Sequence, residues 1–136
     1  MIITICGSMK FAKEMLETKE ELERMGHTAH VARDTELCVK DPDLNDNIEH
    51  CSQNDVMRYH FGLIEKSDAV ITLNHNKKGV DNYVGANTLI DMGIAHYLGK
   101  KIFLLNPIPD LPCRTELHLM NPVLLEGDLG KLGAAE

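Results

Sequence analysis

Aromatic residues are scarce in this chain. Its 136 residues include three Phe, three Tyr and no Trp. A protein that binds a flavin usually provides aromatic side chains that stack on the flavin ring. The shortage therefore argues against a flavin-binding electron carrier, and we expect no cofactor.

The sequence also lacks the common metal-binding patterns. The four cysteines, at positions 6, 38, 51 and 113, form no Cys-x-x-Cys pair, and the seven histidines show neither His-x-x-x-His nor His-Glu-x-x-His spacing. Such spacings place two ligands around one metal ion from a single segment. We therefore predict no metal site, and we expect the cysteines to be free thiols.

Positive charge is sparse and dispersed. There are 14 Lys and Arg against 21 Asp and Glu, so the formal net charge is -7, and the basic residues form no run. A nucleic-acid polymer is disfavoured as a partner, because neutralising its phosphates needs clustered cations. A small anionic substrate needs only a few local donors and is still compatible with this composition.

No hydrophobic stretch approaches the length that spans a bilayer. The first ten residues lack the basic start of a signal peptide, and their apolar run stops at Gly7 after the length of a strand. We expect a cytoplasmic protein with no membrane partner.

Short apolar runs alternate with segments of helical periodicity. The runs predict strands at residues 2–6, 27–32, 69–73, 101–105 and 123–125. Apolar residues at helical spacing predict helices from Ser8 to residue 25, at 48–66, at 86–98 and at 114–120. The stretch 33–47 is rich in Asp and Asn, and we expect a long loop there.

This alternation predicts an α/β fold, with a single doubly wound parallel sheet of about five strands and helices on both faces. The length suits one domain over residues 1–136. Ligands of such sheets bind beyond the carboxyl ends of the strands. The segments that follow the strands are therefore the place to look for a site.

Gly7, Ser8 and Met9 form the turn between the first strand and the first helix. Free N–H groups at a helix start bind polar oxygens, so this turn could hold a ribose hydroxyl or a 5′-phosphate. A tight turn with Ser8 as the helix cap explains the same residues without a ligand, and the two interpretations carry equal weight. The segment is neither a P-loop nor Gly-x-Gly-x-x-Gly, so triphosphates and dinucleotides are not indicated.

The helix at 86–98 carries one carboxylate, Asp91, about one turn from its start. At about 100° per residue, Asp91 lies beside Asn87 on the flank of the apolar stripe, between core and solvent. The helix dipole favours an ionised carboxylate there, as a nucleophile requires. Acidic residues are also common near helix starts because of that dipole alone, so spacing does not decide the role.

Several motifs, in order along nearly the whole chain, resemble the nucleoside 2-deoxyribosyltransferase family. Residues 3–8 are similar to its first strand and binding turn, and residues 67–71 to the entry of its third strand. Residues 91–95 (DMGIA) and 99–102 (GKKI) resemble its Glu-x-Gly-x-Ala and the Gly-Lys that precedes a strand. The family includes transferases that exchange the base of a deoxynucleoside and hydrolases of deoxynucleoside monophosphates. The resemblance implies one flavodoxin-like (Rossmann-like) domain over residues 1–136, a homodimer or larger oligomer, and no metal.

The resemblance also implies a covalent mechanism, in which a carboxylate attacks C1′ of the sugar. The matching position here is Asp91, where the family has Glu, so the carboxylate ends one methylene earlier. Transferases of the family often carry an Asp on the preceding helix, at a register that holds His60 in this chain. His60 could move protons at the leaving base, since imidazole titrates near neutrality, or it could be a packed helix residue.

The expected substrate contacts come from the segments that follow the strands and from the helix at 86–98. They are Gly7, Ser8, Met9, Asp34, Asn74, Asn82, Asn87 and Asn106. Lys77 and Lys78 could meet a substrate phosphate, although a solvated pair of charges explains them as well.

Two functions remain open at this point. One is an enzyme that cleaves or transfers the N-glycosidic bond of a (deoxy)nucleoside or its monophosphate. The other is a non-catalytic nucleotide-binding module of the same fold, which the shorter carboxylate and the missing second one favour. A response-regulator phosphoacceptor is excluded, because Cys6, Gly7 and Asn74 stand where it needs acidic residues.

Overall fold

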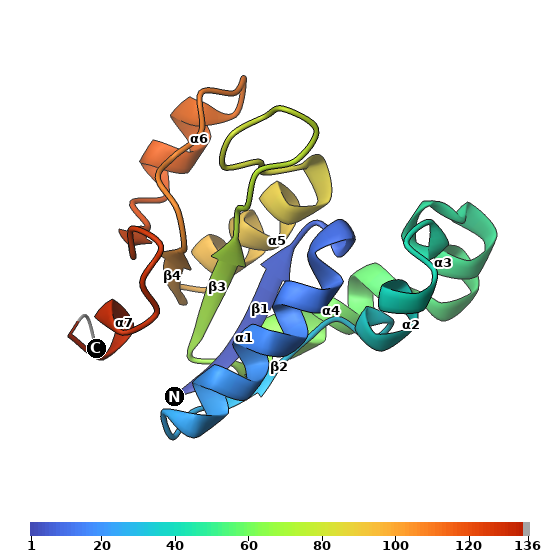
Figure 1. Cartoon of the computed structure of the whole chain (residues 1–136), viewed down its shortest axis with the longest axis horizontal. Helices are drawn as coiled ribbons and strands as arrows, with labels where there is room; N and C mark the ends of the chain where they lie inside the picture. Colours follow the sequence, from blue (N-terminus) through green and yellow to red (C-terminus); the bar gives the residue numbers. More distant parts are fainter. Residues whose placement is uncertain (135–136) are drawn as a thin grey trace.

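The computed structural model describes residues 1–134, whose strands form one five-stranded sheet in the order β2-β1-β3-β4-β5 (Figure 1). All neighbouring strands are parallel. Their bounds are β1 Ile2–Gly7, β2 Thr28–His30, β3 Ala69–Leu73, β4 Lys101–Leu104 and β5 Val123–Leu124. The predicted α/β, flavodoxin-like architecture is confirmed.

Helices connect the strands. They are the 3₁₀ turns η1 Met9–Phe11 and η2 Leu44–Asp46, and the α-helices α1 Ala12–Arg24, α2 Thr35–Lys40, α3 Ile48–Asn54, α4 Val56–Lys66, α5 Ala86–Tyr97, α6 Arg114–Leu119 and α7 Lys131–Ala134. Within the part of the chain that the structure describes, no helix is long and apolar enough to cross a membrane.

The two faces of the sheet bury separate cores, because successive strand residues point to opposite sides. Ile3 and Ile5 of β1 pack with Met15 and Leu22 of α1 on one face. Cys6 directly follows Ile5 and therefore points to the other face, where it packs with residues of α4, α5 and α6. Figure 1 shows α1 and α5 on opposite sides of the sheet. The end of β1 therefore delivers the Cys6 side chain between α4 and α5.

Two expectations about residues 33–66 were wrong. The expected loop at 33–47 contains α2 and η2, and the expected single helix at 48–66 is divided into α3 and α4. The division falls at Asp55, which has a left-handed backbone (φ 45°), and its side chain caps α4 by accepting from the Arg58 amide. Asp tolerates this conformation better than most residues, so a break at Asp55 is inexpensive. Figure 1 shows α2 and α3 extending beyond the β2 edge as an arm.

Candidate active site

Two adjoining cavities lie at the end of β1, beside the first half of α5. The inner cavity, of about 30 Å³, is lined by Cys6, His60 and Asp91 among others. The outer cavity, of about 140 Å³, is lined by Ser8, Lys77 and the start of α5. Both cavities are lined by the same four residues where they meet: Gly7, Met9, Asn45 and Asn87. They therefore adjoin one another at the edge of the sheet where ligands of this fold bind, and we refer to the two together as the recess.

Gly7, which lines both cavities, lets the end of β1 lie close to Leu73 of β3. A side-chain carbon at this position would lie 3.0 Å from the Leu73 carbonyl oxygen and 3.1 Å from the end of Met15. Because the first of these neighbours is backbone, it cannot move aside easily. Glycine is therefore required here by packing.

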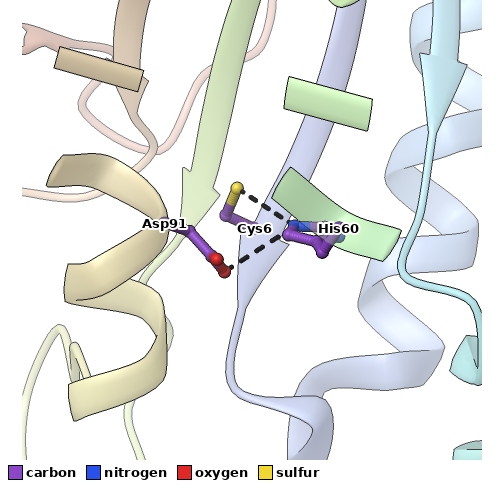
Figure 2. Close-up of side chains that lie close together, drawn as sticks. All are labelled: Cys6, His60 and Asp91. Carbon is purple, nitrogen blue, oxygen red and sulfur yellow. Dashed lines mark hydrogen bonds and ion pairs between the residues drawn. The ribbon is translucent and has the colours of Figure 1, made fainter. Parts of the chain in front are cut away.

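Three side chains that line the inner cavity come from three elements and lie close together, as Figure 2 shows. Cys6 comes from β1, His60 from α4 and Asp91 from α5, and they are 1%, 7% and 5% exposed. The His60 Nε2 atom lies 3.5 Å from Cys6 Sγ and 3.7 Å from Asp91 Oδ2. His60 Nδ1, on the other side of the ring, has no hydrogen-bond partner among the described residues.

Burial sets the protonation of the Asp91–His60 pair. It raises the pKa of Asp91 to about 7 and lowers the pKa of His60 to about 4. Both groups are therefore neutral between these values, and Asp91 is about half ionised at neutral pH. The helix dipole was expected to favour the ionised form of Asp91, but burial outweighs that effect. Asp91 lies beyond the first turn of α5, and the cost of burying a charge is larger than the effect of the dipole.

Sequence reasoning did not select Cys6 as a site residue. Burial raises the pKa of its thiol well above the ordinary value, and the nearby Asp91 raises it further. The thiol is thus protonated at physiological pH, and on its own it is a poor nucleophile. The only signal in the sequence was the alternation of β1, which places Cys6 on the face of the sheet away from Ile3 and Ile5. That alternation does not predict which side chains of the helices Cys6 will contact.

The outer cavity collects hydrogen-bond donors. Lys77 Nζ donates to Ser8 Oγ at 3.2 Å and lies 4.5 Å from the centre of the Tyr83 ring. Ser8 also caps η1, accepting from the Lys10 amide at 3.3 Å. The pKa of Lys77 is lowered mainly by burial, and then by Lys78 and Lys10.

The N-terminus of α5 faces the same cavity. Its N-cap is Gly85, which provides no side-chain acceptor, and the first turn contains no acidic residue. The next three residues, Ala86, Asn87 and Thr88, line the outer cavity. The helix start and Lys77 together form a suitable environment for an anion.

The arm supplies the opposite wall of the outer cavity through Pro42, Asn45 and Asp46. Lys10 holds this wall: its Nζ donates to the Pro42 carbonyl at 2.6 Å and pairs with Asp43 at 3.1 Å and Asp46 at 3.6 Å. The recess therefore lies between the sheet edge and the arm.

The structure brings most of the expected site residues together. The inner or outer cavity is lined by Gly7, Ser8, Met9, His60, Asn87 and Asp91.

Asn74 and Asn106 line neither cavity, contrary to expectation, and instead bind one another. The Asn74 amide donates to the carbonyls of Asn106 and Pro107 at 3.0 and 3.1 Å, and its oxygen accepts from the Asn106 backbone at 2.8 Å. The Asn106 side chain donates to the Asn74 carbonyl at 3.1 Å. These bonds fasten the ends of β3 and β4 together, so the two residues have a structural role.

Asp34 and Asn82 also lie outside both cavities. Asp34 precedes α2 and pairs with His50 of α3 at 2.9 Å, which ties the arm together. Asn82 has a left-handed backbone (φ 56°) and donates its N–H to the Asn76 side chain at 3.0 Å. Both residues stabilise the segments that frame the recess.

No family model and no curated relative matches the chain. Among solved structures, the fold is similar to a 2-deoxyribosyltransferase from the psychrotolerant bacterium Bacillus psychrosaccharolyticus, with a TM-score of 0.55 and 20% identity over 76% of this chain and 71% of that one. It is also similar to the CMP N-glycosidase BcmB of Clostridium botulinum, with a TM-score of 0.57 and 19% identity over the whole of both chains. The expected similarity in fold is therefore confirmed, although the sequence identity to both proteins is 20% or lower.

Proposed function

We propose that this chain cleaves the N-glycosidic bond of a nucleoside 5′-monophosphate, with Asp91 as the nucleophile. One observation carries the proposal: a buried carboxylate with a pKa of about 7 lines the inner end of a recess whose outer end offers donors for an anion. The similarity in fold to a CMP N-glycosidase and a 2-deoxyribosyltransferase supports the choice of bond.

The phosphate would occupy the outer cavity. Lys77 and the N–H groups at the start of α5 are donors of the kind that hold phosphate oxygens, and Ser8, which accepts from Lys77, adds a hydroxyl. A nucleoside without phosphate would leave these donors unused. We therefore expect the monophosphate to be the better substrate.

The sugar would then lie where the two cavities meet, with C1′ toward Asp91. A carboxylate oxygen forms a bond to C1′, the C1′–N bond breaks, and its electron pair leaves with the base, which takes a proton from water. Water then attacks C1′ of the glycosyl ester and gives up a proton, which frees Asp91 and the sugar phosphate. The inner cavity exceeds the roughly 10–15 Å³ that one water needs, so we propose hydrolysis ahead of transfer to a second base.

His60 would position Asp91 and would not act as an acid. Its pKa of about 4 leaves the ring neutral at physiological pH, so it has no readily available proton for the leaving base. Its Nε2 atom lies 3.7 Å from Asp91 Oδ2, which is too far for a hydrogen bond but close enough to restrict the orientation of the carboxylate.

A substrate panel tests the proposed function. The protein is incubated with the common ribo- and deoxyribonucleosides and their 5′-monophosphates, with and without an acceptor base, and released base is measured by chromatography. We expect release from at least one monophosphate, at a rate that exceeds that of its nucleoside and does not need an acceptor. Nucleotide binding without any base release would favour the non-catalytic binding module.

We also propose that the chain forms a homodimer or larger assembly. The segment at 117–125 exposes Leu119 (74%) and Leu124, whereas its neighbours Leu117 and Leu125 are buried in the core. Exposed leucines at the β5 edge of the sheet could form an interface with a second copy of the chain. Light scattering at micromolar concentration should give at least twice the chain mass, and a monomer would contradict this prediction.

A further inference from the structure

Cys6, His60 and Asp91 form a cluster whose potential metal ligands all lie within 4.8 Å of one another. No other group of three such residues exists among residues 1–134. The ligands come from β1, α4 and α5, so no short sequence motif predicts the site. Figure 2 shows the three side chains pointing toward one another.

The geometry of the cluster differs from that of a Cys-His-Asp catalytic triad. In a triad, the nucleophile contacts one ring nitrogen of the histidine and the carboxylate contacts the other. Here both Cys6 and Asp91 approach Nε2, at 3.5 and 3.7 Å. Nδ1 has no hydrogen-bond partner among the described residues, so no relay passes through the ring.

The two distances from His60 Nε2 fit ligands of one metal ion, and Cys6 Sγ lies within 4.8 Å of an Asp91 carboxylate oxygen. With the usual zinc bond lengths, tetrahedral geometry requires about 3.6 Å between sulfur and nitrogen and about 3.4 Å between nitrogen and oxygen. The observed 3.5 and 3.7 Å are close to these values. A water in the adjoining inner cavity can complete the coordination, since the cavity is large enough for one.

The ligand types and charges select the ion. Thiolate and imidazole suit Zn²⁺, whereas Mg²⁺ prefers oxygen ligands in octahedral geometry. A bound thiolate and carboxylate would balance the two positive charges, so a Zn²⁺ complex of Cys6, His60 and Asp91 is neutral. Neutrality matters because all three side chains are buried.

We propose that Cys6, His60 and Asp91 form a reversible site for a thiophilic divalent ion, Zn²⁺ first, and that the bound ion inhibits the glycosidic reaction. Inhibition rests on the proposed function: an Asp91 oxygen that coordinates the ion cannot attack C1′. Reversibility follows from the lack of a partner for His60 Nδ1, since losing such a partner typically costs about 10–100-fold in metal affinity.

Cobalt provides a direct test of the site. The protein is treated with EDTA, desalted and titrated with Co²⁺, and then with Zn²⁺ as competitor. We expect one Co²⁺ per chain, with the visible spectrum of a tetrahedral ion and a thiolate charge-transfer band, and displacement by Zn²⁺ but not by Mg²⁺. Cys6→Ser and Cys6→Ala should lose the charge-transfer band and bind at least tenfold more weakly.

Cys38→Ser is the matched control, because Cys38 is also buried but belongs to α2. It should bind Co²⁺ as the wild type does. Thermal unfolding shows whether each variant is folded, and His60→Gln gives the same prediction of weakened binding if the Cys6 variants are not. No charge-transfer band in the wild type, or an equal band in Cys6→Ala, would overturn the proposed site.

Activity is measured separately on the best substrate of the panel. Saturating Zn²⁺ should lower base release at least tenfold, and EDTA should restore it, while Mg²⁺ has no effect. Stimulation by Zn²⁺ would overturn the inhibitory role. If no substrate is cleaved, the proposed function fails, and the cobalt titration still decides whether the metal site exists.

Discussion

The inner and outer cavities differ in the ionisation of the groups that line them. In the inner cavity, burial suppresses ionisation: the Cys6 thiol is protonated, His60 is neutral, and Asp91 is only half ionised near pH 7. In the outer cavity, Lys77 and the start of α5 present positive charge. The comparison separates two tasks, since the outer cavity is suited to selecting an anion and the inner one to reacting at a bond. Substitutions in the inner cavity should therefore affect the chemical step, and substitutions in the outer cavity should affect substrate binding.

The largest effect is expected from Asp91→Asn, which keeps the shape of the side chain and removes its charge. Base release should fall at least about a thousandfold, because an amide cannot act as the nucleophile. Nucleotide binding, measured by calorimetry, should persist because the outer cavity is unchanged. Asp110→Asn, at a fully exposed carboxylate, is the control and should have no effect. Undiminished turnover in Asp91→Asn would show that another group is the nucleophile.

The pH dependence of kcat/KM should follow the ionisation of Asp91. Its raised pKa of about 7 means that the ionised fraction, and with it the rate, falls about tenfold per pH unit below that value. We expect an approximately 100-fold lower rate at pH 5 than at pH 8. His60 adds no second transition in this range, because its pKa is about 4. The measurement is made in EDTA, and a rate independent of pH from 5 to 8 would contradict the assignment.

Lys77→Gln should weaken the outer cavity alone. Losing a charge-assisted hydrogen bond to phosphate costs about 1.5 kcal/mol or more, so KM for the monophosphate should rise about tenfold. The kcat value should change little, and so should the rate with the unphosphorylated nucleoside. Lys78→Gln is the matched control, because Lys78 is the exposed neighbour that lines neither cavity. Equal effects of the two substitutions would show that Lys77 acts only through general charge.

The smallest effect is expected from Asp91→Glu. The added methylene moves the carboxylate by about 1 Å toward the cavity, and misplacement of that size can cost up to about 100-fold in rate. Repacking around the longer side chain offsets part of the gain, so we expect kcat to rise about fivefold. A lower kcat would mean that the inner cavity is already fitted to aspartate.

The fold was accessible from the sequence because its signals are local. The apolar run at 69–73 is bounded as predicted, and the helix at 86–98 is one residue shorter in the structure. The arm was missed, because α2 is a short helix that buries only Thr35 and Cys38, too few residues to produce a periodic pattern. Its position depends on tertiary contacts, such as those of Lys10 with the Pro42 carbonyl and Asp43.

The site was only partly accessible, for a related reason. Residues at the carboxyl ends of strands could be listed from the topology rule, and Gly7 and Ser8 do line the recess. Asp91, which was selected from its helix position and the family resemblance, lines it too. The same rule selected Asn74, whose partner Asn106 lies 32 residues away. Nothing local distinguishes an asparagine that binds a ligand from one that binds another loop. The protonation of Asp91 also depends on burial by several elements, which the helix position alone does not give.

We expect the Lys10 ion pairs to make the outer cavity sensitive to ionic strength. Lys10 joins the β1–α1 turn to the arm through ion pairs with Asp43 and Asp46, whose side chains are largely exposed. Mobile ions screen such pairs over a Debye length of about 8 Å at physiological salt and about 3 Å at 1 M. The buried contacts of the inner cavity are screened much less. Rising salt should therefore weaken these two ion pairs at the wall that faces Lys77 and the start of α5, while the Asp91 end keeps its geometry.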